Sequence, residues 1–131
     1  MNITARQIER ASQDKQPEIG LVQGKMPDSK NEWYFALACD KLELEYIFQY
    51  QIGGGERGSQ WVDFLVMTGL GWAACYIQGA HWHTRETRTE DTLKQQVAAY
   101  MFGQNNVFEF NDEETESIEA AVVSIKKKLV V

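Results

Sequence analysis

Three short apolar segments, separated by glycine-containing turns, constrain the fold of this chain more than any other feature. Residues 45–52 alternate partly in polarity, and residues 60–67 return as a second apolar segment after a glycine-rich loop, so together they predict a β-hairpin. Residues 72–78 follow a turn at 68–71 and are apolar on both faces, which is typical of a central strand. We therefore expect an antiparallel meander of three strands.

The alternation in residues 45–52 also predicts which side chains share a face of the sheet. On a regular strand, one face would carry four large side chains: Tyr46, Phe48, Tyr50 and Ile52. Packing in the core is the simpler interpretation of this face. Stacking of the aromatic rings on nucleic-acid bases is the alternative.

A helix is expected before the strands. Ser29 and Glu32 have the spacing of a capping box, in which the two side chains close the first turn of a helix. Apolar residues follow at helical spacing, so the pattern predicts a helix from about residue 30 to residue 42.

Three more elements are expected after the meander. In order, they are a helix over 89–101 capped by Gly103, a strand over 106–110, and a helix from a second capping box at Asn111 and Glu114 to about Lys128. A helical crossover before the fourth strand suits parallel pairing with a right-handed connection. The expected fold class is α/β, with the order αβββαβα and a mixed four-stranded sheet flanked by helices.

Length and composition indicate the domain organisation of the protein, its location and the partners it can bind. The 131 residues fit one domain, which we divide into an N-terminal arm over 1–28 and a folded domain over 29–131. The sequence has no membrane-span pattern and no signal-peptide pattern, so we expect a cytoplasmic protein with no membrane partner. Cys39 and Cys75 lie in apolar surroundings without metal-type spacing, which predicts reduced core thiols. A net charge of −6 disfavours a broad basic face for nucleic acid.

Two short motifs carry side chains that could take part in catalysis or metal binding. Asp63 lies between Val62 and Phe64 in an apolar strand, where a carboxylate is costly unless it is paired or exposed. His81 and His83 flank Trp82, and a histidine with an ordinary pKa of about 6.5 can move a proton near neutral pH. The simpler interpretations are a solvated loop histidine for His83 and a purely capping role for Glu32.

The element order and these motifs together resemble the PD-(D/E)XK nuclease superfamily. Within it, the chain is most similar to the branch of very short patch repair endonucleases and related phage proteins, over residues 29 to 128. The matching positions are Glu32 in "SKNEW", Asp63 in "WVDFLV", and Gly79, Trp82 and His83 in "GAHWH".

The resemblance implies a metal-dependent DNA endonuclease that hydrolyses phosphodiester bonds in repair or in a phage. It implies a restriction-endonuclease-like fold, and a site in which Asp63 and the backbone carbonyl of Ile77 bind Mg²⁺, with Mn²⁺ as a substitute. His83 would act as the base, and Glu32 would be a further catalytic residue. The carboxylate, the carbonyl and the imidazole are then expected to converge within roughly 8 Å of one another.

The chain departs from the superfamily on its third strand. Typical members carry an acid and often a lysine where this chain has Tyr76 and Gln78. This departure keeps an alternative open, in which the domain lacks catalysis and serves as a structural or nucleic-acid-associated partner. Arginines and lysines near the site are offset by neighbouring acids, so DNA binding is expected to be weak and salt-sensitive. A homodimer or a larger assembly is also compatible with the sequence.

Overall fold

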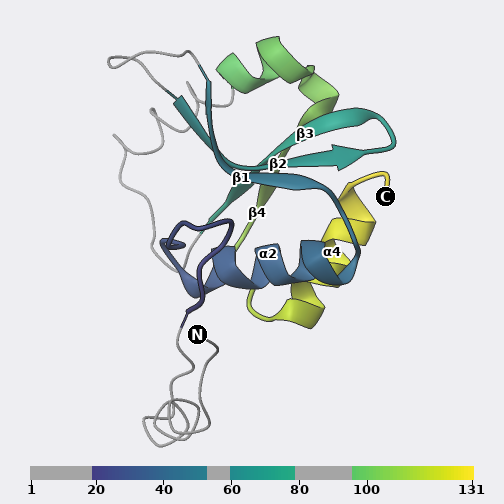
Figure 1. The fold of residues 1–131 in the computed structure, drawn as a ribbon. Coiled ribbons are helices and arrows are strands. Elements are labelled where there is room, and N and C mark those ends of the chain that lie inside the picture. The colour runs from purple at the N-terminus through teal and green to yellow at the C-terminus, as the bar shows by residue number, and fades with distance from the viewer. Residues whose placement is uncertain (1–18, 53–59, 79–95) are drawn as a thin grey trace, which may run out of the picture.

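A mixed four-stranded sheet forms the centre of the molecule (Figure 1). The computed structural model describes residues 19–52, 60–78 and 96–131. The strands lie in the order β1-β2-β3-β4, with bounds Tyr46–Ile52 for β1, Gln60–Thr68 for β2, Gly71–Ile77 for β3 and Val107–Phe110 for β4. β1, β2 and β3 pair antiparallel, and β4 pairs parallel to β3. The expected meander and mixed α/β sheet are confirmed.

Helices cover both faces of the sheet. Helix α2 (Lys30–Lys41) and helix α4 (Ile118–Lys128) lie on one face, and the helical residues 96–102 lie on the other (Figure 1). Two buried clusters follow this division, one between the sheet and α2 with α4, and a smaller one around Ala98. The prediction that the two helices before and after the meander cover the sheet is therefore confirmed for the described residues.

Aromatic rings fill the larger cluster, between the sheet and α2. The ring of Phe64 on β2 lies with its centroid 4.7 Å from that of Phe35 on α2 and 4.9 Å from that of Phe48 on β1. Phe110 on β4 reaches the same group, 4.9 Å from Phe35. All four rings are fully buried. Phe64 is thus the residue through which α2, β1 and β2 pack together.

The two halves of β1 present their side chains to opposite faces of the sheet. Tyr46 and Phe48 pack on the α2 side, whereas Tyr50 and Ile52 pack in the smaller cluster on the other side. The reversal occurs at Gln49, whose φ of 57° is in the left-handed region and turns the chain over. The prediction that these four side chains share one face is therefore wrong, although all of them contribute to the core.

The last helix begins later than the sequence pattern predicts. Asn111 and Glu114 do form the reciprocal bonds of a capping box, with N–H to side-chain oxygen distances of 2.8 and 2.9 Å, but these bonds close a turn. The hydroxyl of Thr115, fully buried, donates to the carbonyl of Asn111 and holds this turn in place. The helix starts at Ile118, and its N-cap is Ser117, whose hydroxyl accepts the N–H of Ala120.

Other local predictions agree with the structure. Gly103 ends the 96–102 helix with a φ of 95°, and its N–H donates to the carbonyl of Ala99. Cys39 and Cys75 are buried free thiols, and burial raises the pKa of both far above its ordinary value. Within the described part of the chain, no helix has the length and apolar character needed to cross a membrane.

Part of the expected N-terminal arm packs against the domain. Residues 1–18 lie outside the described residues, but residues 22–25 form a tight turn in which Val22 and Lys25 exchange two backbone hydrogen bonds. Val22 is only 4% exposed and belongs to the α2 side of the core. Residues 22–25 are thus part of the folded domain and not of a separate arm.

Candidate functional site

Asp63 lies at the point where the pairing of β2 with β3 ends. The last residues paired between these strands are Phe64 and Cys75. Asp63 is the residue before Phe64 on β2, and its Oδ2 atom accepts the backbone N–H of Ile77 at 2.8 Å. A side-chain carboxylate therefore takes a backbone donor of β3, which fixes the orientation of the carboxylate against that strand.

Asp63 lies where β2 changes the face of the sheet to which its side chains point. Phe64, on one side of Asp63, packs in the larger cluster, and Val62, on the other side, packs in the smaller one. The neighbouring strand β1 reverses its faces at Gln49, between Phe48 and Tyr50, which lie opposite Phe64 and Val62. Asp63 and Gln49 thus mark the same irregular point on the two strands.

Glu32 lies in the first turn of α2 and is buried. Its backbone N–H donates to the hydroxyl of Ser29 at 3.2 Å, so the expected cap at Ser29 is present. Its Oε1 atom accepts the backbone N–H of Asp28 at 3.0 Å. The side chain is on a residue only 6% exposed, which is unusual for a glutamate. Glu32 thus helps to close the start of the helix and also places a carboxyl group inside the fold.

Electrostatics connect Glu32 to Asp63. Burial raises the pKa of Glu32 from 4.5 to about 7; the hydrogen bond from Asp28 opposes this rise, and the negative charges of Asp63 and Asp28 add to it. The carboxylate of Asp63 is therefore close enough for its charge to act on Glu32. Two carboxyl groups from α2 and β2 share one region, and one of them exchanges its proton near neutral pH.

Asp63 acts on a second group on the α2 side of the sheet. Burial, the neighbouring Cys39 and then the charge of Asp63 raise the pKa of Cys75, which faces α2 in the larger core cluster. The charge of Asp63 therefore acts on two groups on the α2 side of the sheet, Glu32 and Cys75.

Tyr76 and Gln78 stand where the resemblance would place an acid and a lysine, and the structure shows what each of them contacts. Tyr76 is 6% exposed and packs in the smaller cluster, on the opposite side of the sheet from α2. The side-chain amide of Gln78 donates to the carboxylate of Glu109 on β4 at 3.2 Å. Neither residue supplies a carboxylate or an ammonium group of its own to the region of Glu32 and Asp63.

Of the remaining predicted site residues, the structure describes only Ile77. His83 lies outside the described residues, as do Gly79, His81 and Trp82. The N–H of Ile77 bonds to Asp63, whereas the role of its carbonyl as a metal ligand stays a prediction. Asp28 was missed by sequence reasoning, although its place just before the N-cap was a signal that its N–H would face the first turn.

The side chains of the site limit the kind of metal ion that it could bind. Within residues 19–52, 60–78 and 96–131, no three His, Cys, Asp or Glu side chains form a group that could hold a metal ion. Glu32 and Asp63 offer two carboxyl groups, and Mg²⁺ is commonly held by one or two carboxylates, several waters and substrate phosphate oxygens. Two carboxyl groups are ligands of the kind that Mg²⁺ uses, and the binding of Mg²⁺ by Glu32 and Asp63 stays a prediction.

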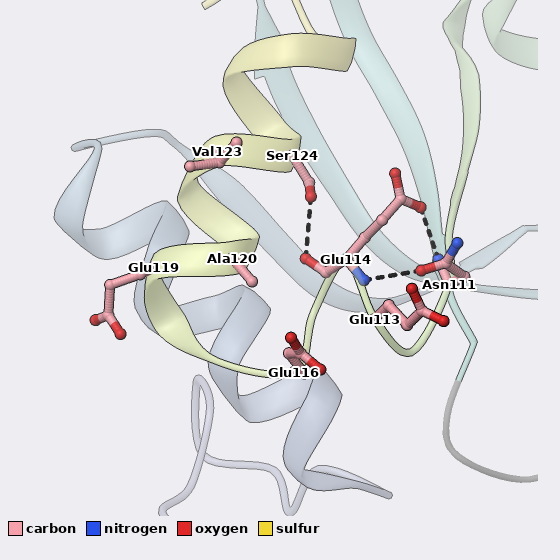
Figure 2. A pocket seen from close by; sticks show the side chains of 8 residues that line it. All are labelled: Asn111, Glu113, Glu114, Glu116, Glu119, Ala120, Val123 and Ser124. Atoms are coloured by element: carbon pink, nitrogen blue, oxygen red, sulfur yellow. Dashed lines mark hydrogen bonds between the residues drawn. The ribbon is translucent and has the colours of Figure 1, made fainter.

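A separate hollow lies beside the start of α4. It has a volume of about 520 Å³, and Figure 2 shows it between the turn after β4 and the first turns of the helix, with glutamates around it. Ser124 donates to the carbonyl of Glu114 at its wall, 3.1 Å away. Glu113, Glu116 and Glu119 also line it, so the negative charge disfavours a phosphate there.

Comparisons of the chain with protein-family models, with curated proteins and with solved structures gave no match.

Proposed function

We propose that the chain is a metal-dependent DNA endonuclease with a restriction-endonuclease-like arrangement of its elements. The observation that carries this proposal is the pair of carboxyl groups from α2 and β2. Glu32 is buried with its pKa raised to about 7 by burial, and Asp63, whose charge adds to that rise, is held against β3 by the N–H of Ile77. Perturbed carboxyl groups of this kind concentrate at functional sites.

In the proposed reaction, the oxygen of a water molecule attacks the phosphorus of a DNA phosphodiester. The bond from phosphorus to one sugar oxygen breaks, the proton of the water passes to a base, and the leaving oxygen takes a proton from solvent. A bound Mg²⁺, or Mn²⁺ in its place, would polarise the phosphate and neutralise the developing charge. Asp63 and Glu32 are the proposed carboxylate ligands of the metal ion, and the backbone carbonyl of Ile77 is the proposed third ligand.

His83 is the proposed base, because an imidazole can accept a proton near neutral pH. The basic residues of the chain are outnumbered, 13 against 19 acidic ones, so we propose that DNA is bound weakly and with strong salt dependence. We also propose that the chain acts in the cytoplasm, as a homodimer or within a larger assembly.

A second candidate function rests on the third strand. Tyr76 and Gln78 stand where an acid and a lysine are usual, and the amide of Gln78 is engaged by Glu109. These side chains favour a nuclease-like domain without catalysis, which would serve as a structural or nucleic-acid-associated partner. The two candidates differ in one property, the cleavage of DNA in the presence of Mg²⁺.

A plasmid-nicking assay separates the two candidates. Wild-type protein is incubated in Mg²⁺ and in Mn²⁺ with duplex, mismatched and branched DNA, beside the variants Asp63→Asn and Asp112→Asn. Asparagine keeps an oxygen that can accept the N–H of Ile77 but has no charge, so the first variant should fold and lose cleavage. Asp112 is exposed and gives a matched control for the same chemical change. Cleavage that survives Asp63→Asn, or a wild type that cleaves none of these substrates, would refute the proposed mechanism.

The variant His83→Ala tests the proposed base. Loss of a general base lowers a rate by about 10²- to 10⁴-fold, while metal binding by the carboxylates should persist. The measurement is the single-turnover rate of nicking at saturating Mg²⁺. An unchanged rate would exclude His83 as the base and leave the assignment of Asp63 intact.

A further inference from the structure

Among the strands of residues 19–52, 60–78 and 96–131, β1 forms one edge of the sheet, and an edge strand presents backbone groups that can pair with another chain. Glu45, just before β1, uses its carbonyl to accept the N–H of Met67 and so faces β2. Because successive residues of a strand alternate, the carbonyls and N–H groups of Tyr46 and Phe48 face away from β2. These are the groups that an added strand would bind.

One side chain occupies two of these groups. The amide of Gln23 donates from Nε2 to the carbonyl of Tyr46 at 2.7 Å, and its Oε1 atom accepts the N–H of Phe48 at 2.8 Å. A primary amide contains a donor and an acceptor, as a peptide group does. The Gln23 side chain therefore binds the edge of β1 as a neighbouring strand would.

A lysine covers the next positions. Nζ of Lys25 donates to the carbonyl of Phe48 at 3.2 Å and to that of Gln49 at 3.4 Å. Lysine on a sheet edge discourages the approach of another strand, because its charge would have to lose water.

The turn that carries these two side chains is anchored. Val22 and Lys25 exchange backbone bonds of 2.8 and 2.9 Å, and Val22 is buried in the core at 4% exposure. Gln23 and Gly24, between them, have φ values of 50° and 82°, the signs that a type I′ turn requires. The Gln23 amide is thus held over β1 by the fold and not by its own bonds alone.

A lysine also contacts the strand at the other end of the strand order, β4. The carbonyl of Phe110 accepts the N–H of Gln78 and faces β3, so the carbonyl of Glu109 faces away from the sheet. Nζ of Lys128 donates to that outward carbonyl of Glu109. A lysine from outside the sheet therefore covers an outward carbonyl on each of the two edge strands.

β1 has a sequence that would pair readily if it were uncovered. Its seven residues, YIFQYQI, contain no charge and no proline, and six- or seven-residue segments of that composition are prone to self-association. Ile47 on this strand is 36% exposed.

We propose that the 22–25 turn is an edge cover that prevents a second copy of this chain from adding its own β1 to the sheet. The partner excluded is a second copy, because β1 of that copy has the same uncharged sequence and can pair with this edge in an antiparallel manner. The inference is independent of the proposed endonuclease activity.

The test removes the cover without weakening the turn. In the variant Gln23→Asn with Lys25→Ala, the Asn-Gly pair suits a type I′ turn better than Gln-Gly does, but its amide is one methylene shorter and cannot reach both backbone groups. The matched control is Gln104→Asn with Lys126→Ala, the same changes at exposed positions outside the turn. Circular dichroism establishes that each variant is folded.

Molecular mass is measured by sedimentation velocity over a concentration series. The cover variant should gain one association step, a doubling of mass relative to the wild type at the same concentration, and the control should match the wild type. Equal masses for the cover variant and the wild type across the series would overturn the proposal.

Hydrogen exchange gives a second and independent readout. At a dilution where the single variant Gln23→Asn has the wild-type mass, the amide of Phe48 should exchange roughly tenfold faster, because it has lost its acceptor. The amide of Leu65, buried between two paired strands, serves as the internal reference. An unchanged rate at Phe48 would show that Gln23 does not cover the edge.

Discussion

Replacing Glu32 with glutamine should make the stability of the protein less dependent on pH between pH 4.5 and about pH 7. The ordinary pKa of a glutamate is 4.5, and burial raises the pKa of Glu32 in the folded protein to about 7. Glutamine has nearly the shape of the protonated carboxyl group, and its oxygen can still accept the N–H of Asp28. The variant therefore mimics the neutral form of Glu32 at every pH.

The sign and size of the effect follow from proton linkage. Between pH 4.5 and about 7, the unfolded chain has released this proton while the folded protein still binds it, so the free energy of unfolding falls as pH rises. The stabilisation is fully present below pH 4.5 and is lost through about pH 7. An interval of about 2.5 pH units at about 1.4 kcal/mol per unit gives a loss of about 3 kcal/mol in the wild type.

The measurement is urea unfolding followed by tryptophan fluorescence from pH 4 to pH 8.5, with a chelator present to keep metal ions from the carboxylates. The difference in unfolding free energy between Glu32→Gln and wild type should shift in favour of the variant by about 3 kcal/mol across this range. Other titrating groups are common to both proteins and cancel in the difference. Glu113→Gln, at an exposed glutamate, is the control and should show no such shift. Parallel stability curves for Glu32→Gln and wild type would refute the assignment of a raised pKa to Glu32.

Two further predictions concern packing. Phe64→Ala removes the ring on which α2, β1 and β2 meet and should lower the free energy of unfolding by about 3–5 kcal/mol in urea titrations; a loss below about 1 kcal/mol would contradict its central place. Asn31→Ala removes the amide that donates to the carbonyl and the hydroxyl of Thr115 at 3.2 and 3.0 Å, and should cost about 1–3 kcal/mol and speed hydrogen exchange in the turn before α4. Asn105→Ala, at an exposed position, should leave both quantities unchanged.

The strands and helices could be predicted because each has a strong local pattern. The apolar segments, the glycine turns and the cap at Ser29 act over a few residues, and the structure places the four strands and the helix after Ser29 close to their expected bounds. The reversal of faces in β1 could not be predicted in this way. It depends on a left-handed φ at Gln49, a residue type that gives no signal for that conformation.

The late start of α4 has a related cause. A capping-box pattern at Asn111 describes two hydrogen bonds, and both bonds form, but they are equally compatible with a turn. What decides between turn and helix is the burial of Thr115 and its contact with Asn31 on α2, which lie far apart in the sequence. Tertiary contacts thus override a local signal.

The candidate site was predictable only in part. Asp63 is conspicuous in the sequence because a carboxylate in an apolar strand needs an explanation. Glu32 looks like an ordinary exposed cap, and its burial becomes visible only when α2 is packed on the sheet. The edge cover at Gln23 has no sequence pattern, since it consists of one amide that meets β1 across 23 and 25 positions of the chain.

The most direct test of the acid pair is the binding of Mn²⁺, measured by electron paramagnetic resonance on the protein without DNA. Wild type should bind Mn²⁺, with an affinity that rises as the pH increases through 7 and Glu32 loses its proton. Asp63→Asn should abolish this binding, and Asp112→Asn should bind as the wild type does. A wild type that binds no Mn²⁺, or an Asp63→Asn variant that binds it unchanged, would contradict the proposal that Glu32 and Asp63 form a metal site.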